Sequence, residues 1–290
     1  MDKSPSDKST ARRVSKMGFI GGGNMAYAIV VGLIKYGKVE PSTIIISTRT
    51  TASGEKFSKL GCQVTTKNAD LVKEVKGSGT DGAIFLCVKP IQFTENRSTF
   101  RALLSCFDGH IVSVMAGLTI ESLEDVLGKG LNIVRTIPNT GVQVGAGVWA
   151  CSVRNNYSGF EKLQNIASTV SFFPVVEEKL IDIISGLSGS GIAFIYTAIQ
   201  ALSDGAVKMG LDRTLATRIA AATVIGAGKT VQETETHPYV LRDNVCSPGG
   251  TTIYGIHSLD KAGFSGILMD AVEASTVRCK IVAQGKQDKK

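Results

Sequence analysis

Two periodicities divide the first half of the chain into alternating strands and helices. Runs that are apolar throughout predict buried strands, and apolar residues that recur every three or four positions predict helices. Strand-like runs occur at Ser15–Ile20, Thr43–Ser47, Gly82–Val88, His110–Val114, Asn132–Ile137 and Ala146–Val153. Helix-like stretches lie between them at Met25–Tyr36, Thr51–Leu60, Ile91–Leu104 and Ile120–Leu127, and Ser158 with Glu161 has capping-box spacing for one further helix. Because such strands need cover on both faces, the pattern predicts an α/β fold with a Rossmann-type, doubly wound parallel sheet.

From about Glu177 onward the strand pattern stops, and long helices follow at Ile192–Met209, Arg213–Val231 and Ser265–Ala283. We therefore expect a disordered polar tail at 1–14, a dinucleotide-binding Rossmann domain at 15–176 and an all-α helical domain at 177–290. The stretch Leu215–Val231 is apolar or small over most of its surface and must be buried nearly all round. This predicts a homo-oligomer built through the helical half, with an internally packed bundle as the alternative.

Charge and composition narrow the classes of partner. The net charge is +7, but residues 1–16 hold five Lys or Arg against two Asp, and residues 286–290 hold three Lys against one Asp, so the body carries only +2. Such a body argues against a nucleic-acid binder and suits an anionic substrate with a phosphorylated cofactor. The six cysteines are dispersed without a CxxC pair and there are three histidines, so we expect reduced thiols and no metal site.

The longest uncharged run, Ile183–Ser203, is long enough to cross a bilayer, but its first half is rich in Gly and Ser. We interpret it as a flexible entry followed by a buried helix and expect no membrane partner. The amino end lacks the apolar stretch of a secretory signal, which favours a cytoplasmic protein. Arg12 and Arg13 among Ser and Thr leave a mitochondrial address open.

The first predicted strand leads into Gly21-Gly22-Gly23-Asn24-Met25-Ala26, a GxGxxA loop that opens the first predicted helix. In such loops the first glycine permits the tight turn, the second admits the pyrophosphate, and the third, small residue lets helix and strand pack closely. The second strand is followed by Thr48 and Arg49 rather than by a carboxylate. Arg49 can hold a 2′-phosphate, so NADPH is favoured over NADH; a solvated loop charge is the alternative.

A second anion-binding device lies in the stretch Asp243–Thr252, which contains Ser247-Pro248-Gly249-Gly250-Thr251-Thr252. A Pro-Gly-Gly turn before two threonines leaves backbone N–H groups available at a helix start, which makes a cradle for a substrate carboxylate. An ordinary turn and helix cap is the alternative. The chain is thus expected to bind a nucleotide through one device and an acid through the other.

Several motifs together resemble those of the pyrroline-5-carboxylate reductase family, from about Lys16 to Ala283. They are Phe19–Ala26, Val88–Pro90, Pro138–Thr140, Gly186–Gly191, Asp204–Leu211 and the very specific stretch Asp243–Asp260. The resemblance implies NAD(P)H-dependent reduction of L-1-pyrroline-5-carboxylate to L-proline, the last step of proline biosynthesis, by hydride transfer to the C=N carbon. It also implies a helical dimerisation domain and homodimers that often assemble into larger rings.

Carried over to matching positions, the resemblance implies two sets of site residues. Cofactor contacts are implied at Ile20, Gly21, Gly22, Gly23, Asn24, Met25, Thr48, Arg49, Asn68, Cys87, Val88, Lys89, Pro90, Val114, Met115, Ala116 and Asn244. Substrate contacts are implied at Glu235, Gly250, Thr251 and Thr252, with the Thr252 hydroxyl closest to the imine and the catalytic candidate. Lys89 is equally a helix-start residue, and Thr252 equally an N-cap. The family usually has Pro at the positions of Gly141 and Ile192, so loop geometry there is expected to differ.

A neutral hydroxyl is a weak acid, so we expect the imine to arrive protonated or to take its proton from water. Catalysis would then be mostly orientation of the hydride donor and acceptor. Two other classes fit parts of the chain. A β-hydroxyacid dehydrogenase needs a catalytic lysine, for which Lys208 is the only tempting candidate, and a non-enzymatic NADPH sensor has no need for the carboxyl-end cradle.

Overall fold

The computed structural model describes residues 16–154 and 159–283. They form two compact units, each of which is described by itself: the first runs to Gly189 and resumes at Ser275, and the second is Ser190–Ala274. The expected tail at 1–14 and the expected cap at Ser158 lie outside the described residues. A functional border after residue 176 stays a prediction.

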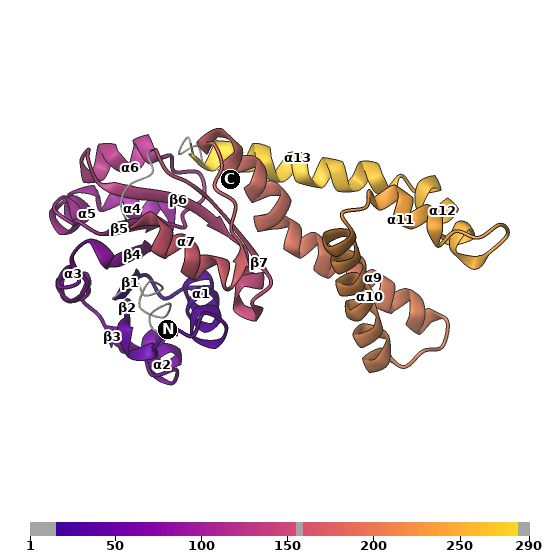
Figure 1. Cartoon of the computed structure of the whole chain (residues 1–290), viewed down its shortest axis with the longest axis horizontal. Coiled ribbons are helices and arrows are strands. Elements are labelled where there is room, and N and C mark those ends of the chain that lie inside the picture. Colours follow the sequence, from indigo (N-terminus) through magenta and orange to yellow (C-terminus); the bar gives the residue numbers. More distant parts are fainter. Residues whose placement is uncertain (1–15, 155–158, 284–290) are drawn as a thin grey trace, which may run out of the picture. The chain divides into compact units, whose positions relative to one another are not determined.

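The first unit alternates strands and helices, as its apolar runs predicted (Figure 1). Its elements up to β5 are β1 Met17–Ile20, α1 Asn24–Lys35, η2 Pro41–Thr43, β2 Ile44–Ser47, α2 Thr51–Ser58, β3 Gln63–Thr65, α3 Asn68–Lys76, η3 Gly79–Asp81, β4 Ala83–Leu86, α4 Pro90–Glu95, α5 Arg97–Leu104 and β5 His110–Ser113. The elements that follow are α6 Ile120–Leu127, β6 Asn132–Pro138, η4 Thr140–Val144, β7 Gly147–Ser152, α7 Phe160–Ser168, β8 Ser171–Phe172, η5 Glu178–Leu180, α8 Ile181–Ile184 and the π-helical η6 Ser185–Ser190.

The strands form one eight-stranded sheet in the order β3-β2-β1-β4-β5-β6-β7-β8. The pairs from β3 across to β6 are all parallel, with Met17 of β1 opposite both Ile44 of β2 and Ala83 of β4. Strand order reverses between β1 and β4, and open α/β sheets bind ligands at such a switch point, beside the carboxyl ends of the strands. The predicted doubly wound sheet is therefore confirmed.

One strand pair departs from the predicted parallel sheet. β7 runs antiparallel to β6, with Pro138 opposite Trp149. The reason is the connection: η4 and a few flanking residues join the two strands, whereas a parallel neighbour needs a crossover of about a dozen residues or more. β8 then returns parallel to β7 after helix α7.

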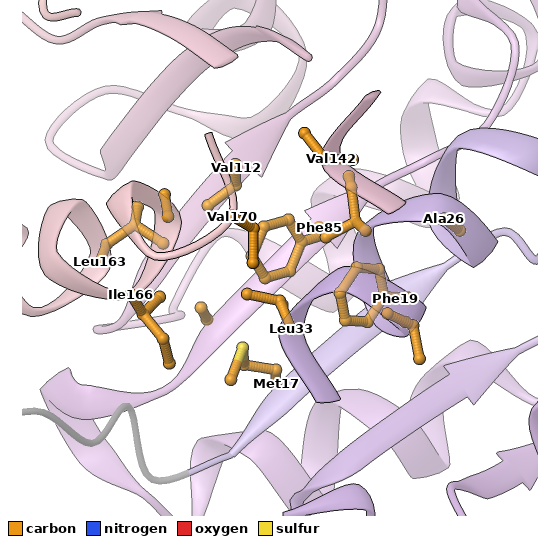
Figure 2. Close-up of a cluster of buried hydrophobic side chains, with 14 of the residues drawn as sticks. Met17, Phe19, Ala26, Leu33, Phe85, Val112, Val142, Leu163, Ile166 and Val170 are labelled. Carbon is orange, nitrogen blue, oxygen red and sulfur yellow. The ribbon is translucent and has the colours of Figure 1, made fainter. Parts of the chain in front are cut away.

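Alternate strand residues pack against helices on opposite faces of the sheet, because successive side chains of a strand point to opposite sides. Phe19 belongs to the cluster covered by α1, α2 and α7, and its ring stacks on that of Phe85 at 4.4 Å (Figure 2). Ile20, the next residue, belongs to the second cluster, which α3, α4, α5 and α6 cover. This double cover explains why the strands read as apolar throughout.

The structure differs from the sequence prediction within one predicted helix and in the segment from Gln63 to Lys76. The stretch Ile91–Leu104 is two helices, because Asn96 leaves helical geometry (φ −108, ψ 32) and its amide donates to the Gln92 carbonyl oxygen at 2.8 Å. The strand β3 and the helix α3 were not predicted. β3 is short and polar at the sheet edge, while Leu71, Val72 and Val75 give α3 a buried face that the sequence does contain.

The second unit is helical, and its elements are α9 Gly191–Lys208, α10 Arg213–Thr234, α11 Pro238–Asn244, α12 Thr251–Lys261 and the first part of α13 Phe264–Ala283. The long helices α9, α10 and α13 were predicted; α11 was not. Helices α9 and α10 pack together, with the Ser203 and Thr217 hydroxyls 3.0 Å apart.

The described residues bury little of α9 and α10. Buried positions are Gly191 and Ser203 in α9 and Ala216 and Ala220 in α10, while Ile219 and Ile225 are exposed. Within the described part of the single chain, therefore, the helices are not buried all round and no internally packed bundle forms. Their burial in an oligomer stays a prediction. The continuous helical stretch Glu178–Lys208 is long and apolar enough to cross a membrane by length and composition, which is weak evidence by itself.

The segment that leads out of the first unit is anchored by charge. Arg135 of β6 is buried and pairs with Glu178 at 3.3 Å and with Asp182 at 2.5 Å. Where the chain returns to this unit, the Cys279 thiol lies 3.2 Å from the Ser185 hydroxyl. The exit and return points of the chain are therefore neighbours.

Candidate functional site

A cleft of about 790 Å³ lies at the carboxyl ends of β1, β2 and β4, within the size range of small-molecule sites. Its walls come from the glycine loop, the segment after β2, the start of α3 and the α4–α5 region. The lining residues are Ile20, Gly21, Gly22, Gly23, Ser47, Thr48, Arg49, Thr50, Ser53, Thr66, Asn68, Cys87, Val88, Lys89, Gln92, Asn96, Thr99 and Phe100. This lining contains two cationic residues and no Asp or Glu, so it suits an anion.

The glycine loop has the backbone geometry that its sequence predicted. Gly21 has φ +105, and a Cβ there would lie 2.5 Å from the carbonyl oxygen of Cys87, so only glycine fits. Its N–H donates to the Ser47 carbonyl oxygen at 3.0 Å, which ties the loop to the end of β2. At Gly23, by contrast, a Cβ would meet nothing within 4 Å, so the backbone is open to an approaching ligand.

Helix α1 begins at this loop with its first N–H groups available. The first helical bond runs from the Tyr27 N–H to the Gly23 carbonyl oxygen at 3.0 Å, and the first turn holds no acidic residue. Unpaired N–H groups and the helix dipole favour a phosphate at this end. Ala26 is fully buried, as the close packing of helix and strand requires, and Gly32 lies against the Val142 carbonyl oxygen.

The wall after β2 combines hydroxyls with one cation. Thr48 is buried, and its hydroxyl donates to the Thr50 carbonyl oxygen at 2.9 Å. Thr50 and Ser53 form the capping box that starts α2. Arg49 is exposed, and within the described part of the chain its side chain has no ion-pair partner. A guanidinium placed there can form a bidentate pair with a phosphate.

Cys87, Val88 and Lys89 follow β4 and form the opposite wall. Desolvation raises the pKa of the Cys87 thiol, so it stays protonated and is no nucleophile at neutral pH. The Lys89 N–H donates to the Gln92 side-chain oxygen at 3.3 Å, and Pro90 opens α4, so Lys89 is a helix-start residue whose side chain also reaches the cleft.

Some predicted cofactor contacts do not line the cleft. Asn24 and Met25 lie in the first turn of α1, Pro90 opens α4, and Val114, Met115 and Ala116 follow β5. Sequence reasoning in turn missed several lining residues: Ser47, Thr50, Ser53, Thr66, Gln92, Asn96, Thr99 and Phe100. The i, i+4 and i+7 spacing of Gln92, Asn96 and Thr99 was the available signal, because it places three polar side chains on one face of a helical segment.

The Pro-Asn-Thr motif fixes a turn and a loop at once. The Asn139 side-chain oxygen accepts from the N–H groups of Gly141 at 3.1 Å and Val148 at 3.2 Å. Its amide nitrogen donates to the Ser188 hydroxyl at 3.1 Å and so holds the π-helical segment η6. The proline that the family usually has at position 141 could not donate the first of these bonds.

The predicted substrate residues all belong to the second unit. The predicted helix start is present: α12 begins at Thr251 with Gly250 as its N-cap, and Gly249 has φ +67. The Gly250 N–H donates to the Ser247 carbonyl oxygen at 3.0 Å. The N–H groups of Thr251 and Thr252 belong to the first turn of α12, where no intrahelical acceptor is available, and they have no partner in the described chain.

The other predicted contacts of this unit lie at helix ends. Asn244 ends α11, and Glu235 follows α10 in the left-handed conformation at φ +50. Lys208, the lysine that a β-hydroxyacid dehydrogenase would need, is exposed in the last turn of α9. The described residues contain no group of three or more His, Cys, Asp or Glu side chains that could hold a metal ion.

A Rossmann sheet, a glycine turn with an open second glycine and an acid-free cleft together define a dinucleotide-dependent oxidoreductase of the two-part, sheet-plus-helices class. Comparisons with known proteins narrow the class. Residues 178–281 match the pyrroline-5-carboxylate reductase dimerisation family, and residues 16–117 match the coenzyme F420-dependent NADP oxidoreductase family. Pyrroline-5-carboxylate reductase 3 of Danio rerio is 39% identical over 267 residues, covering 91% of this chain and 90% of that protein. The chain belongs to the pyrroline-5-carboxylate reductase family.

Solved structures agree with this assignment. A pyrroline carboxylate reductase of Plasmodium falciparum with NADP bound is 27% identical, with a TM-score of 0.81 over 92% of this chain and 98% of that one. A pyrroline-5-carboxylate reductase of Coxiella burnetii is 33% identical, with a TM-score of 0.78 over 92% of this chain and 98% of that one.

Proposed function

We infer that this protein reduces L-1-pyrroline-5-carboxylate to L-proline with NADPH, the last step of proline biosynthesis. The observation that carries this function is the likeness to a pyrroline-5-carboxylate reductase along nine-tenths of both chains, 91% of this one and 90% of the relative. The acid-free cleft supports the cofactor, because Arg49 and Lys89 offer charge to phosphates and no carboxylate of the lining repels a 2′-phosphate.

Within the site, each residue has a task of binding or orientation. The glycine loop and the first N–H groups of α1 bind the pyrophosphate, and Arg49 binds the 2′-phosphate. We also propose that Val114 to Ala116, after β5, and Asn244, in the second unit, contact the cofactor. When bound, NADPH supplies the hydride.

On the substrate side, the N–H groups of Thr251 and Thr252 at the start of α12 bind the carboxylate, and Glu235 completes the contacts. The Thr252 hydroxyl donates a hydrogen bond to the nitrogen of the neutral imine and accepts one from the N–H of the iminium. Because a hydroxyl is too weak an acid to protonate that nitrogen, the iminium proton comes with the substrate or from water. Rate enhancement then rests mostly on orientation of the two reacting partners.

A comparative assay tests the function. The purified full chain is given NADPH or NADH with pyrroline-5-carboxylate or with simple keto acids, and NADP+ or NAD+ with simple hydroxy acids, while absorbance of the reduced cofactor is followed. We expect turnover with pyrroline-5-carboxylate and higher kcat/KM with NADPH than with NADH. Turnover of a hydroxy acid without turnover of the imine would overturn the proposal.

Replacing Thr252 tests the proposed hydrogen bond. Thr252→Ala should lower kcat/KM roughly tenfold to a hundredfold, since one hydrogen bond to a charged group of the substrate is lost. The Kd for NADPH should stay unchanged. Thr252→Ser should keep most of the activity. Thr230→Ala is the control, because among the described residues that hydroxyl bonds only the Gly226 carbonyl oxygen of its own helix. Unchanged turnover in Thr252→Ala would remove this hydroxyl from the mechanism.

The oligomer that we propose is a homodimer formed through the second unit, which can assemble further into a ring of dimers. The exposed apolar residues of α10, and the dimerisation family that matches residues 178–281, support it. We also propose that the protein acts in the cytoplasm without a membrane partner. Light scattering of the purified chain tests the first proposal, and fractionation of cells tests the second against a mitochondrial address.

A further inference from the structure

Ser47 is a buried hydroxyl on the wall of the dinucleotide cleft that the reaction itself does not use. It is the last residue of β2 and only 3% exposed, among strands that are otherwise apolar. A serine placed there loses contact with water and needs a partner within the protein. Its hydroxyl donates to the side-chain oxygen of Asn68 at 2.6 Å.

Asn68 is the first residue of α3 and lines the same cleft. Its side chain is partly exposed, so without a partner the amide could rotate to present either its oxygen or its nitrogen. The bond from Ser47 holds the oxygen toward the end of β2. The amide nitrogen, which has no hydrogen-bond partner within the described chain, is then the group left to face the cleft.

The backbone of Ser47 has a separate task. Its carbonyl oxygen accepts from the Gly21 N–H and holds the glycine turn. Replacing the Ser47 side chain by a smaller one keeps this carbonyl in place. The contribution of the hydroxyl can therefore be measured without removing the backbone bond that shapes the loop.

We propose that Ser47 is a positioning residue for the adenosine end of the cofactor, which acts by turning the Asn68 amide nitrogen into the cleft as a donor. Two donors lie at this wall, the amide nitrogen of Asn68 and the guanidinium of Arg49. They match the acceptor oxygens of the 2′-phosphoribose. The inference deepens the proposed function and rests on its use of an NADP-type cofactor. It concerns binding alone, so it can fail or hold independently of pyrroline-5-carboxylate reduction.

The test measures the Kd of 2′,5′-ADP, the adenosine end of NADPH, by titration calorimetry on the full chain. Ser47→Ala and Asn68→Ala should each weaken binding about tenfold, the effect of losing one hydrogen bond to a charged group. If Ser47 acts through Asn68, the double variant should bind no more weakly than Asn68→Ala alone. Losses that multiply in the double variant, or a Ser47→Ala chain that binds like the wild type, would overturn the proposal.

Further variants separate positioning from folding. Ser152→Ala removes an equally buried serine, also 3% exposed, at the end of β7 and away from the cleft, and its Kd should match the wild type. Ser47→Thr keeps the hydroxyl and should stay within about threefold. Should Ser47→Ala fold poorly, Ser47→Cys fills nearly the same volume with a weak donor and should show the same loss; wild-type binding by Ser47→Cys would contradict the proposal.

Binding of 2′,5′-ADP by a wild-type chain that reduces no imine would refute the function and leave this inference standing.

Discussion

The two units of this chain bury their apolar residues to very different extents. In the first, the sheet is covered on both faces, and side chains such as Phe19, Phe85 and Leu33 are completely buried within a single copy (Figure 2). In the second, helix α10 buries only Ala216 and Ala220 and leaves Ile219 and Ile225 exposed. Apolar area of that kind is stabilising only when something covers it. The first unit thus has its core within one chain, while the second needs another surface to complete its own.

Removing a core side chain from the first unit should have the largest effect. Phe85→Ala should lower the free energy of unfolding by about 4 kcal/mol, because the ring is fully buried and stacks on Phe19. Urea unfolding followed by the fluorescence of Trp149, the only tryptophan and itself buried near Phe85, reports this unit. Phe172→Ala, at an exposed ring of β8, should cost less than about 0.5 kcal/mol; equal losses would erase the contrast between core and surface.

Placing a charge on the second unit should act on assembly instead. Ile225→Asp should weaken the proposed homodimer about a hundredfold, because a carboxylate replaces an exposed isoleucine that a partner would cover in that dimer. Sedimentation across a dilution series measures this, and the Trp149 unfolding curve of the dissociated chain should not move. Val144→Asp is the matched control, since Val144 in η4 of the first unit is exposed to the same 60% as Ile225. If both variants dissociate alike, the second unit has no special part in assembly.

Acid should weaken the first unit through one buried histidine. Burial lowers the pKa of His110 from 6.5 to about 4, with Asp81 opposing and Lys162 reinforcing this shift. Between these values the unfolded chain binds a proton that the folded chain excludes, so stability is full above pH 6.5 and falls as the pH drops toward 4. The loss between pH 7 and pH 5 should be roughly 2 kcal/mol.

Urea unfolding of the wild type and of His110→Gln at pH 7 and pH 5 measures this loss. The variant should lack the histidine part of the difference. Identical pH dependence in both proteins would show that His110 does not drive the acid response.

The parts of the fold that could be predicted are those whose conformation is set by residues close to them in the sequence. The run Met17–Ile20 and the glycine loop after it predicted β1, the turn and α1, because apolar periodicity and a required positive φ are both local. The antiparallel direction of β7 was missed although the sequence carries its signal, since only residues 138–145 separate the two predicted runs and a parallel neighbour needs about a dozen residues or more. Edge strand β3 was missed because its exposed polar residues carry no strand pattern.

The residues of the cleft also divide into those that the sequence could predict and those that it could not. Gly21 and Arg49 could be assigned from sequence, because each follows a predicted strand whose end must face the crevice. The bond between Ser47 and Asn68 could not, since it joins the ends of two elements whose spacing only the folded sheet sets. Gln92, Asn96 and Thr99 line the cleft, and their i, i+4 and i+7 spacing was a signal in the sequence that could have identified them.

The contact between Cys279 and Ser185 has a further consequence. Because the polypeptide leaves the nucleotide-binding body and re-enters it at adjacent points, Ser190–Ala274 is an insertion whose two stems are already side by side. The entropic cost of bringing the two ends of such an insertion together grows only with the logarithm of its length. A short linker between these stems would therefore give a minimal chain that retains every strand of the sheet and every residue lining the cleft, and that lacks the helices through which we propose that copies associate.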